Sequence, residues 1–411
     1  MSTLLIRNAR QIFQIEKTKR PLLRGNALSE LPSMEGGYIL IENGRIAAWG
    51  PSSEAPERAD SEIDASGKFV LPAWVDSHTH LVFAGSREVE FADRIRGLSY
   101  EEIARKGGGI LNSARLLRDT PEEHLREATY KRLMEVQKKG TGAIEVKSGY
   151  GLSPESELKM LRVVRWLKEV SKAPVKASFL GAHTVPEAYK ARRADYVKLL
   201  VEEMIPRIAG EGLADYIDVF CEKVAFTVEE MDAILEAGAR YGLKPKVHVN
   251  QFNVMGGVAN AVKHGAISVD HLEVVGEEDF PHLKNSTTVA TLLPSAPFFL
   301  NDHYPPARKL IEEGAAVALA TDYNPGSSPS GSMPLVLSLA CIKLRMTPEE
   351  VINAATLNAA YALELETDCG SIAAGKRADL IITRKVPSLA FLPYAFGSDW
   401  IDQVILQGEL V

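Results

Sequence analysis

Cysteine is scarce: this chain of 411 residues contains three cysteines. They are Cys221, Cys341 and Cys369, and no two of them form a Cys-x-x-Cys pair or another metal-ligand spacing. An odd number of widely separated cysteines argues against a disulfide framework and against a cysteine-based zinc site. We therefore expect a protein of a reducing compartment, the cytoplasm.

Long apolar runs and an excess of basic residues are missing as well. No run approaches the roughly 18 apolar residues that a membrane span needs. The short apolar run near the start is broken at Arg7, so we expect no signal peptide. The 47 Lys and Arg residues against 54 Asp and Glu give a net charge of −7, which provides no general attraction to nucleic acid or anionic lipid. These features predict a soluble protein that acts on a small-molecule substrate, with neither nucleic acid nor a membrane as partner.

What the chain does contain is ordinary for a globular protein. Hydrophobic residues make up 45% and charged residues 25% of the sequence, which is enough to bury a large core. Internal repeats, low-complexity tracts and long linkers are missing from the sequence. The length fits one large catalytic domain with a smaller companion.

The two ends of the chain are rich in short β-prone runs. Near the start, Tyr38 to Glu42 and Arg45 to Trp49 flank Asn43-Gly44, which is a strong hairpin signal. Further runs of this kind are Leu4 to Asn8, Lys68 to Leu71, Ser371 to Ala374, Leu380 to Thr383 and Val404 to Leu406. We predict that residues 1–69 and 371–411 together form a small composite β-sandwich domain.

Between the ends, short apolar runs alternate with helical stretches such as Ser156 to Val170, Val228 to Tyr241 and Gly257 to His264. The candidate buried strands are Phe69 to Asp76, Ala143 to Lys147, Val175 to Leu180, Tyr216 to Cys221, Pro245 to Val249, Ser268 to His271, Val289 to Leu293 and Ala316 to Thr321. Alternating strands and helices imply parallel strands joined by helical crossovers. Eight such units predict an α/β fold, a closed (β/α)8 TIM-like barrel over residues 70–370.

Two segments refine this prediction. The glycine-rich run Lys106 to Ile110 lies well beyond the first strand, so it predicts a flexible loop rather than the phosphate-binding turn of an open doubly wound sheet. The stretch from Leu81 to Thr141 is too long for one simple crossover. We expect an elaborated loop there, over the mouth of the barrel.

Histidines cluster where predicted strands end. The active site of such a barrel collects at the carboxyl ends of its strands. Five of the nine histidines follow predicted strands, namely His78, His80, His183, His248 and His271. We therefore expect these imidazoles to gather on the catalytic rim.

Four of the strand-end residues predict a metal site. Alternate residues of a strand face the same side, so His78 and His80 can chelate one divalent ion. His248 and Asp322, which end two other strands, would complete the ligand set. A divalent ion lowers the pKa of bound water from about 15.7 toward 7, which supplies a nucleophile at neutral pH.

Several blocks of the sequence resemble a known group of enzymes. Val75 to His80, Ala320 to Asp322 and Gly370 to Leu380 resemble the metal-dependent amidohydrolase superfamily. Within it, the chain resembles the imidazolonepropionase family of histidine degradation, through His80 to Glu88, Lys106 to Ile110, Glu145 to Gly151 and Asp322 to Gly326. The resemblance covers nearly the whole chain.

The resemblance implies an activity, a cofactor and a set of contacts. That family opens the ring of 4-imidazolone-5-propanoate with water and gives N-formimino-L-glutamate. The resemblance implies one divalent metal ion, Zn or Fe, held by His78, His80, His248 and Asp322, and it implies a homodimer. The substrate or product contacts that it implies are Tyr150, His183, Gln251, Asn324, Gly326 and Ser327.

Two functions can be assigned to particular side chains on chemical grounds. The planar fork of Arg87 suits the propanoate carboxylate of such a substrate, although Arg87 could also be a surface residue. A ring nitrogen must leave with a proton. Asp322 is the leading candidate for carrying that proton, and His271 is the second.

One position departs from the pattern of the family. Many members have an acid at the third position after the strand-five histidine, where it is assigned as a general base, and this chain has Gln251. An amide is not a useful proton acceptor, so we expect Gln251 to orient the ring or the water. Two alternatives stay open: a related cyclic-amide hydrolase or aminohydrolase that acts on another heterocycle, and an inactive metal- or ligand-binding protein.

Some members of the superfamily carry a carboxylated lysine on strand four that bridges two metals. Lys147, by contrast, is predicted to end strand two. We therefore expect no second metal, and we expect Lys147 to be structural or to be a polar support beneath Tyr150.

Overall fold

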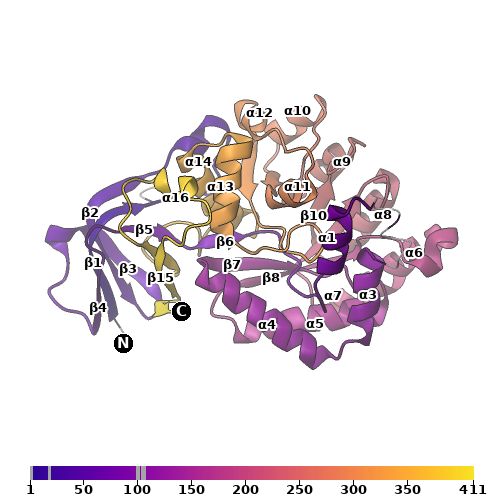
Figure 1. Cartoon of the computed structure of the whole chain (residues 1–411), viewed down its shortest axis with the longest axis horizontal. Helices are drawn as coiled ribbons and strands as arrows, with labels where there is room; N and C mark the ends of the chain where they lie inside the picture. The colour runs from indigo at the N-terminus through magenta and orange to yellow at the C-terminus, as the bar shows by residue number, and fades with distance from the viewer. Residues whose placement is uncertain (1–2, 17–19, 99–101, 103–107) are drawn as a thin grey trace.

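The computed structural model describes residues 3–16, 20–98, 102 and 108–411. It contains two eight-stranded sheets. Figure 1 shows the sheet built from both chain ends at the left and the helix-covered barrel at the right. None of the helices in the described ranges combines the length and the apolar character that crossing a membrane requires.

The terminal sheet joins the two ends of the chain. Its strands are β1 (Thr3–Phe13), β2 (Ser33–Glu42), β3 (Arg45–Pro51), β4 (Ser61–Asp64), β5 (Phe69–Pro72), β14 (Leu380–Thr383), β15 (Ile401–Leu406) and β16 (Glu409–Leu410). They follow the order β16-β15-β14-β5-β1-β2-β3, and β4 pairs with β1. Because β14 pairs with β5, the C-terminal segment completes a sheet that the N-terminal segment begins. We propose that this sheet marks the smaller domain and the barrel the larger one; because β5 extends to Pro72, the first boundary lies three residues beyond the expected limit of residue 69.

The predicted hairpin is confirmed, and one predicted strand is wrong. Glu42 of β2 lies opposite Arg45 of β3, and Asn43 and Gly44 have φ angles of 49° and 78°, as a type I′ turn requires. In the segment Ser371 to Ala374, Ile372 forms an isolated bridge with Ile15 rather than a strand. Gly370 and Gly375, which flank this segment, both have positive φ angles. The chain therefore turns at each end of the segment, and the pairing does not extend into a strand.

The barrel confirms the predicted α/β class. Its strands are β6 (Trp74–Asp76), β7 (Thr141–Lys147), β8 (Val175–Ala182), β9 (Tyr216–Cys221), β10 (Lys244–Val249), β11 (Ser268–His271), β12 (Val289–Leu292) and β13 (Ala316–Leu319). Every neighbouring pair in the order β6 to β13 is parallel. Each predicted strand overlaps one of these, and β9 and β11 have the predicted bounds.

The first predicted strand, Phe69 to Asp76, is divided between the two sheets. Phe69–Pro72 pairs with β1 and β14 of the terminal sheet, whereas Trp74–Asp76 pairs with β7 of the barrel. The switch occurs at Ala73, whose N–H donates to the Asp379 carbonyl while the next N–H, of Trp74, donates to the Gly140 carbonyl. The whole segment is buried, so its apolar pattern does not reveal the change of sheet.

The helices cover the barrel (Figure 1). The α-helices are α1 (Glu88–Ile95), α3 (Ile110–Asp119), α4 (Glu122–Lys138), α5 (Pro154–Val170), α6 (Arg193–Leu199), α7 (Ile205–Gly210), α8 (Val228–Ala239), α9 (Gly257–Lys263), α10 (Asp279–Lys284), α11 (Ser295–Leu300), α12 (Ala307–Glu312), α13 (Met333–Leu344), α14 (Pro348–Ala355), α15 (Leu357–Tyr361) and α16 (Phe391–Tyr394). Shorter helical turns are η1 (Gly25–Ser29), η2 (Ser52–Glu54), η3 (Glu187–Arg192) and η4 (Leu200–Met204).

The predicted helices in α5, α8 and α9 are confirmed, and local sequence explains where two of them start. Ser153 caps α5 by accepting from the N–H of Ser156, and Pro154 occupies the first helical position. Thr227 and Glu230 form a reciprocal capping box at the start of α8. These caps fix where the chain leaves the strand-end loops and thus where the loops lie.

The described part of the long stretch between β6 and β7 contains three helices, α1, α3 and α4. α4 packs against α5 and β7, so it is the crossover helix of the first barrel unit. α1 and α3 are the elaboration, and α1 begins beside Gly326 in the loop after β13. Gly109 precedes α3 with a φ of 84°, while Lys106 and Gly107 of the predicted glycine-rich loop lie outside the described residues.

Candidate active site

The carboxyl ends of β6 and β13 meet at the seam that closes the barrel. The N–H of Asp322 donates to the carbonyl of His78 at 3.0 Å, and the N–H of His80 donates to the carbonyl of Tyr323 at 2.9 Å. Two segments about 240 residues apart in sequence are thereby joined across the rim. The seam fixes Asp322 next to both imidazoles of the His-x-His pair.

Three of the four predicted metal ligands lie together at this seam. The Nε2 atoms of His78 and His80 are each 3.5 Å from Oδ1 of Asp322, and all three side chains are buried. The donor atoms of this group lie within 4.8 Å of one another. That spacing leaves room for a cation with donor distances of about 2 Å.

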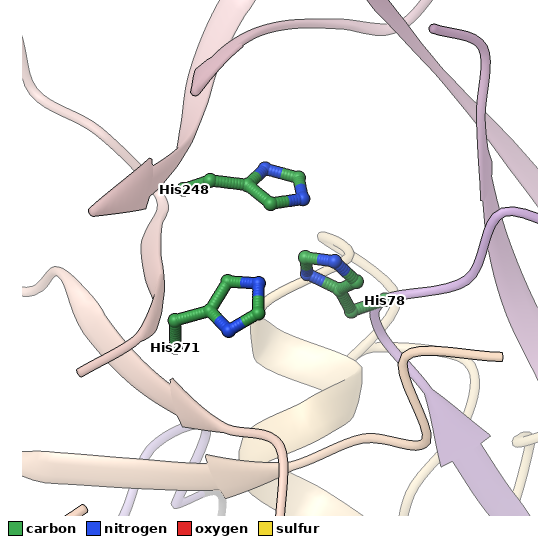
Figure 2. A group of neighbouring side chains, drawn as sticks. All are labelled: His78, His248 and His271. Carbon is green, nitrogen blue, oxygen red and sulfur yellow. The ribbon is translucent and has the colours of Figure 1, made fainter. Parts of the chain in front are cut away.

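The fourth predicted ligand, His248, faces the same space. Figure 2 shows the rings of His78, His248 and His271 turned toward one another from different strand ends, and their donor atoms form a second group within 4.8 Å. The ring centroids of His78 and His248 are 4.5 Å apart. His271, expected to transfer a proton, thus also stands at the edge of the ligand cluster.

Two carboxylates orient the imidazoles of His78 and His248 by binding their Nδ1 atoms, on the ring side away from the candidate metal site. Nδ1 of His78 lies 2.7 Å from Oδ2 of Asp270, and Nδ1 of His248 lies 3.0 Å from Oδ1 of Asp218. The opposite ring atoms, Nε2 of both histidines, are buried and have no hydrogen-bond partner among the described residues. Orphaned Nε2 atoms next to a carboxylate are what a bound divalent ion would satisfy, so the donor set fits a metal.

Burial favours the neutral, ligating form of these rings. Loss of solvation lowers the pKa of His78, His80 and His248 well below the ordinary histidine value. His271 behaves differently: burial lowers its pKa, but the charge of Glu273, whose Oε1 is 3.1 Å from Nδ1, raises it to about 9. Burial also raises the pKa of Asp322 to about 7. Burial therefore favours neutral imidazoles at the ligand positions, whereas Glu273 favours the protonated form of His271.

Tyr150 and His183 both lie beside His80. The His183 ring stacks on His80 with a centroid distance of 5.4 Å, and Tyr150 lies 5.6 Å from His183. Nδ1 of His183 is 3.1 Å from the Gly149 carbonyl. Burial lowers the pKa of His183 to about 4, so its ring is neutral and offers a polar edge to a ligand.

Glu157, which the sequence analysis missed, shapes the loop that carries Tyr150. Its buried carboxylate accepts from the N–H groups of Gly149, Gly151 and Leu152 at 3.1, 2.7 and 2.9 Å. An acid in the first turn of a helix is common, so the sequence alone gives no sign of this function. The structure makes Glu157 the anchor of the loop after β7.

Arg87 stands at the rim, half-buried, with one edge already paired. Its Nε and Nη2 donate to Oε2 of Glu90 at 2.8 and 2.5 Å, and Oε1 of Glu90 accepts from the N–H of Gly109. The remaining nitrogen, Nη1, lies against Gly326, where a Cβ atom would collide with it. Glu90 thus fixes the guanidinium, and Gly326 leaves it room.

The loop after β13 is held largely by its own hydrogen bonds. Asn324 donates to the Asp322 carbonyl at 2.7 Å and accepts from the N–H groups of Gly326 and Ser327 at 2.7 and 2.8 Å. Ser327 lies with its Oγ 3.3 Å from Oδ2 of Asp322. In this structure the Asn324 side chain stabilises the turn, and Ser327 is next to the candidate ligand.

Gln251 lies in the loop after β10 and is half-buried. Glu222, a second residue that the sequence analysis missed, accepts from the N–H groups of Phe252 and Asn253 at 2.7 and 2.9 Å. Asn250 has a positive φ of 55° and donates to Asp279 at 2.8 Å. The signal for Glu222 was its position directly after β9, where rim residues are expected.

Comparison with known proteins identifies the class. The sequence profile described as the Amidohydrolase family matches residues 69–411, so the chain belongs to the amidohydrolase family. A solved structure of atrazine chlorohydrolase from Arthrobacter aurescens TC1, complexed with zinc, has the same fold, with a TM-score of 0.74 and 18% identity over 99% of this chain and 94% of that one.

Two curated relatives are much closer in sequence. An imidazolonepropionase from Christiangramia forsetii is 53% identical over 100% of both chains, and one from Flavobacterium johnsoniae is 51% identical over 99% of both. Within the amidohydrolases, the chain therefore groups with the imidazolonepropionases. This agrees with the resemblance found in the sequence blocks.

Proposed function

We propose that this chain catalyses the hydrolytic ring opening of 4-imidazolone-5-propanoate to N-formimino-L-glutamate. The reaction adds water across a cyclic amide: the water oxygen bonds to the ring carbonyl carbon, the bond from that carbon to the ring nitrogen breaks, and the nitrogen leaves with a proton. Full-length relatedness to imidazolonepropionases supports the substrate. The observation that carries the proposal is the meeting of His78, His80 and Asp322 at the closing seam of the barrel, with His248 facing the same space from the end of β10.

His78, His80, His248 and Asp322 would hold one divalent ion, Zn or Fe. Such an ion, when bound, lowers the pKa of water and polarises a carbonyl, which is the chemistry that amide hydrolysis needs. The neutral imidazoles and the carboxylate match the ligand preferences of both metals. Their orientation is imposed by the protein, through Asp270 behind His78 and Asp218 behind His248.

Proton transfer falls to Asp322, with His271 as the second candidate. Asp322 is buried at the seam, with its Oδ1 3.5 Å from Nε2 of both His78 and His80, so its carboxylate stands beside the candidate metal ligands, where it can take a proton from the attacking water and pass it to the leaving nitrogen. His271 keeps its proton at neutral pH because Glu273 faces its Nδ1, so it can donate to the leaving nitrogen. Gln251 orients the ring or the attacking water with its amide.

Arg87 binds the propanoate carboxylate. Its guanidinium is fixed on one edge by Glu90, which leaves Nη1 as the donor at the rim beside Gly326. The further contacts to substrate or product come from Tyr150, His183, Asn324, Gly326 and Ser327. Because Glu90 holds the Arg87 guanidinium in place, binding of the propanoate there would orient the substrate with its ring carbonyl toward the candidate metal ligands.

An ultraviolet assay of imidazolone disappearance tests the proposal directly. Purified protein, with its metal content quantified, should contain one metal per chain and consume the substrate. His248→Ala should abolish turnover. Metal-replete protein that leaves 4-imidazolone-5-propanoate unchanged would refute the activity.

The amide of Gln251 favours one rival function, a metal- and ligand-binding protein without turnover. Binding of the substrate with no product would support it. A second rival function is a related hydrolase that acts on another heterocycle. If that is the activity, Arg87 has no substrate carboxylate to bind, and replacing Arg87 should leave the affinity for 4-imidazolone-5-propanoate unchanged.

We also propose a cytoplasmic homodimer, as the family resemblance implies. The three cysteines are free, which suits a reducing compartment. Light scattering coupled to size exclusion gives the mass in solution, and a monomeric mass would refute the dimer.

A further inference from the structure

Five ionisable side chains fill the barrel core next to the candidate metal ligands. They are Glu145 and Lys147 of β7, Asp218 of β9, Lys246 of β10 and Asp270 of β11, and none is more than 1% exposed. Buried ion pairs lose solvation that their mutual attraction often fails to recover, so they are weak evidence for a purely stabilising role. The contacts of these five side chains with the histidines indicate a second role, in positioning the candidate metal ligands.

Lys147 lies at the centre of this group. Its Nζ donates to Oε1 of Glu145 and to Oδ2 of Asp218, both at 2.8 Å, and lies 3.5 Å from Oδ2 of Asp270. Burial alone lowers the pKa of Lys147, but the charges of Asp218, Glu145 and Asp270 raise it above its ordinary value. The lysine is therefore a fixed cation between three carboxylates.

Two of these carboxylates are the ones that orient the metal-facing histidines. Asp218 presents Oδ2 to Lys147 and Oδ1 to Nδ1 of His248. Asp270 presents Oδ2 to both Lys147 and Nδ1 of His78, while its Oδ1 accepts from Ser268 at 2.6 Å. A single ammonium is thus in contact with both imidazole supports.

The direction of each Nε2 atom depends on these contacts. An imidazole whose Nδ1 is bound to a fixed carboxylate can present only Nε2 to the centre. Without the Lys147 ammonium, Asp218 and Asp270 would be two buried carboxylates with no shared cation in contact with both. Their oxygens would lose the ammonium that they share, so either carboxylate could rotate away and leave its histidine without support.

We propose that Lys147 is a positioning residue for the metal centre: through Asp218 and Asp270 its ammonium fixes His248 and His78 with Nε2 toward the ion. This inference rests on the metal-dependent function proposed above. It also gives Lys147 a role different from that of a carboxylated bridging lysine. A carbamate would put an anion among three carboxylates, where the structure has a cation.

Zinc affinity measured by competition with a chromophoric chelator tests the proposal. Lys147→Met removes the ammonium and keeps most of the volume. We expect its zinc affinity to fall about 10- to 100-fold, the loss typical for removal of a group that supports metal ligands. The visible absorption of Co(II) bound in place of zinc should change as well, because it reports ligand geometry rather than stability.

Lys376→Met is the matched control. Lys376 is also buried and lies 2.8 Å from Glu16, but among the described residues it forms no ion pair with Asp218 or Asp270. Its loss should lower the melting temperature while leaving the Co(II) spectrum unchanged and costing far less zinc affinity. If both lysine variants lose affinity equally, Lys147 serves stability alone and the proposal is wrong.

Two further variants keep the test decisive if Lys147→Met does not fold. Asp218→Asn and Asp270→Asn remove the charges through which Lys147 acts, and each should lower zinc affinity and alter the Co(II) spectrum. Parent-like affinity and spectra in both would overturn the proposal. These readouts need no turnover, so they stay informative even if the parent protein binds zinc and fails to hydrolyse 4-imidazolone-5-propanoate.

Discussion

The N–H of Asp322 donates to the carbonyl of His78 at 3.0 Å, across the seam where the last barrel strand meets the first. The same two residues approach through their side chains, with Oδ1 of Asp322 3.5 Å from Nε2 of His78. Backbone pairing therefore sets the distance between a candidate ligand from each end of the barrel. The pairing that closes the sheet therefore also brings these two candidate metal ligands together.

Asp322→Asn should lower kcat by about 100- to 10,000-fold, the range expected for loss of a general acid–base group. The amide keeps the size of the side chain and can still accept from Ser327, but it cannot shuttle a proton. Stopped or continuous ultraviolet assays measure kcat, and metal analysis on the same sample separates lost chemistry from lost metal. A fully loaded variant that turns over at the parent rate would remove Asp322 from the proton-transfer step.

Arg87→Met should raise KM for the carboxylate-bearing substrate about 10- to 100-fold, since a charge-assisted hydrogen bond contributes about 1.5–3 kcal/mol. The change in kcat should be smaller, because the propanoate binds in both ground and transition states. Steady-state kinetics measure the split.

Glu90→Gln should have the same effect in weaker form, because it loosens the pairing that fixes Arg87. Arg96→Met is a suitable control: Arg96 directly follows the same helix, α1, and its side chain is 72% exposed. A rise in KM for Arg96→Met as large as that for Arg87→Met would show that the effect is not specific to the rim.

Much of the barrel could be predicted because its strands are buried on both faces. Tyr216–Cys221 is a mainly apolar run that ends before Glu222, and the bounds of this strand and of Ser268–His271 were predicted correctly. The ligand candidates followed from the same pattern, since a polar residue that ends such a run reaches the rim. The division of Phe69 to Asp76 could not be predicted, because burial is complete on both sides of Ala73 and does not depend on which sheet provides it.

The supporting carboxylates were the part of the site that sequence could not give. Glu90 and Glu157 lie near helix starts, where acids are common for reasons of helix polarity. Their functions depend on loops that return to them, from Gly109 to Glu90 and from Gly149 to Glu157. The contacts of Lys147 with Asp218 and Asp270 likewise depend on strands far along the chain, so its position at the end of strand two does not predict them.

Glu157→Gln should weaken both the fold and substrate binding. The carboxylate accepts three backbone N–H groups in a buried loop, and an amide would turn its NH2 group toward at least one of them. We expect a loss of about 1–3 kcal/mol in the free energy of unfolding, the cost of an unsatisfied buried donor. We also expect a higher KM, because the loop positions Tyr150.

Urea unfolding and steady-state kinetics measure the two effects of Glu157→Gln. Glu155→Gln changes the neighbouring turn of α5 at a side chain that is 77% exposed, so it serves as the control. An unchanged KM together with lowered stability would mean that the loop is needed for folding but not for placing Tyr150.

The pH dependence of kcat distinguishes the two candidate proton donors. Burial lowers the pKa of His271, but Glu273, Asp322 and Asp270 raise it to about 9. The ring therefore carries its proton below that pH and loses it above. If His271 donates to the leaving nitrogen, kcat should fall as pH rises through the pKa of this group. A bound cation would move that fall to lower pH because like charges repel.

Glu273→Gln should shift the fall in kcat further toward low pH, and His271→Gln should abolish it. His264→Gln, a histidine paired with Asp232 on the surface, should leave the profile unchanged. A profile that is the same in the parent and in both rim variants would assign the proton transfer to Asp322 alone.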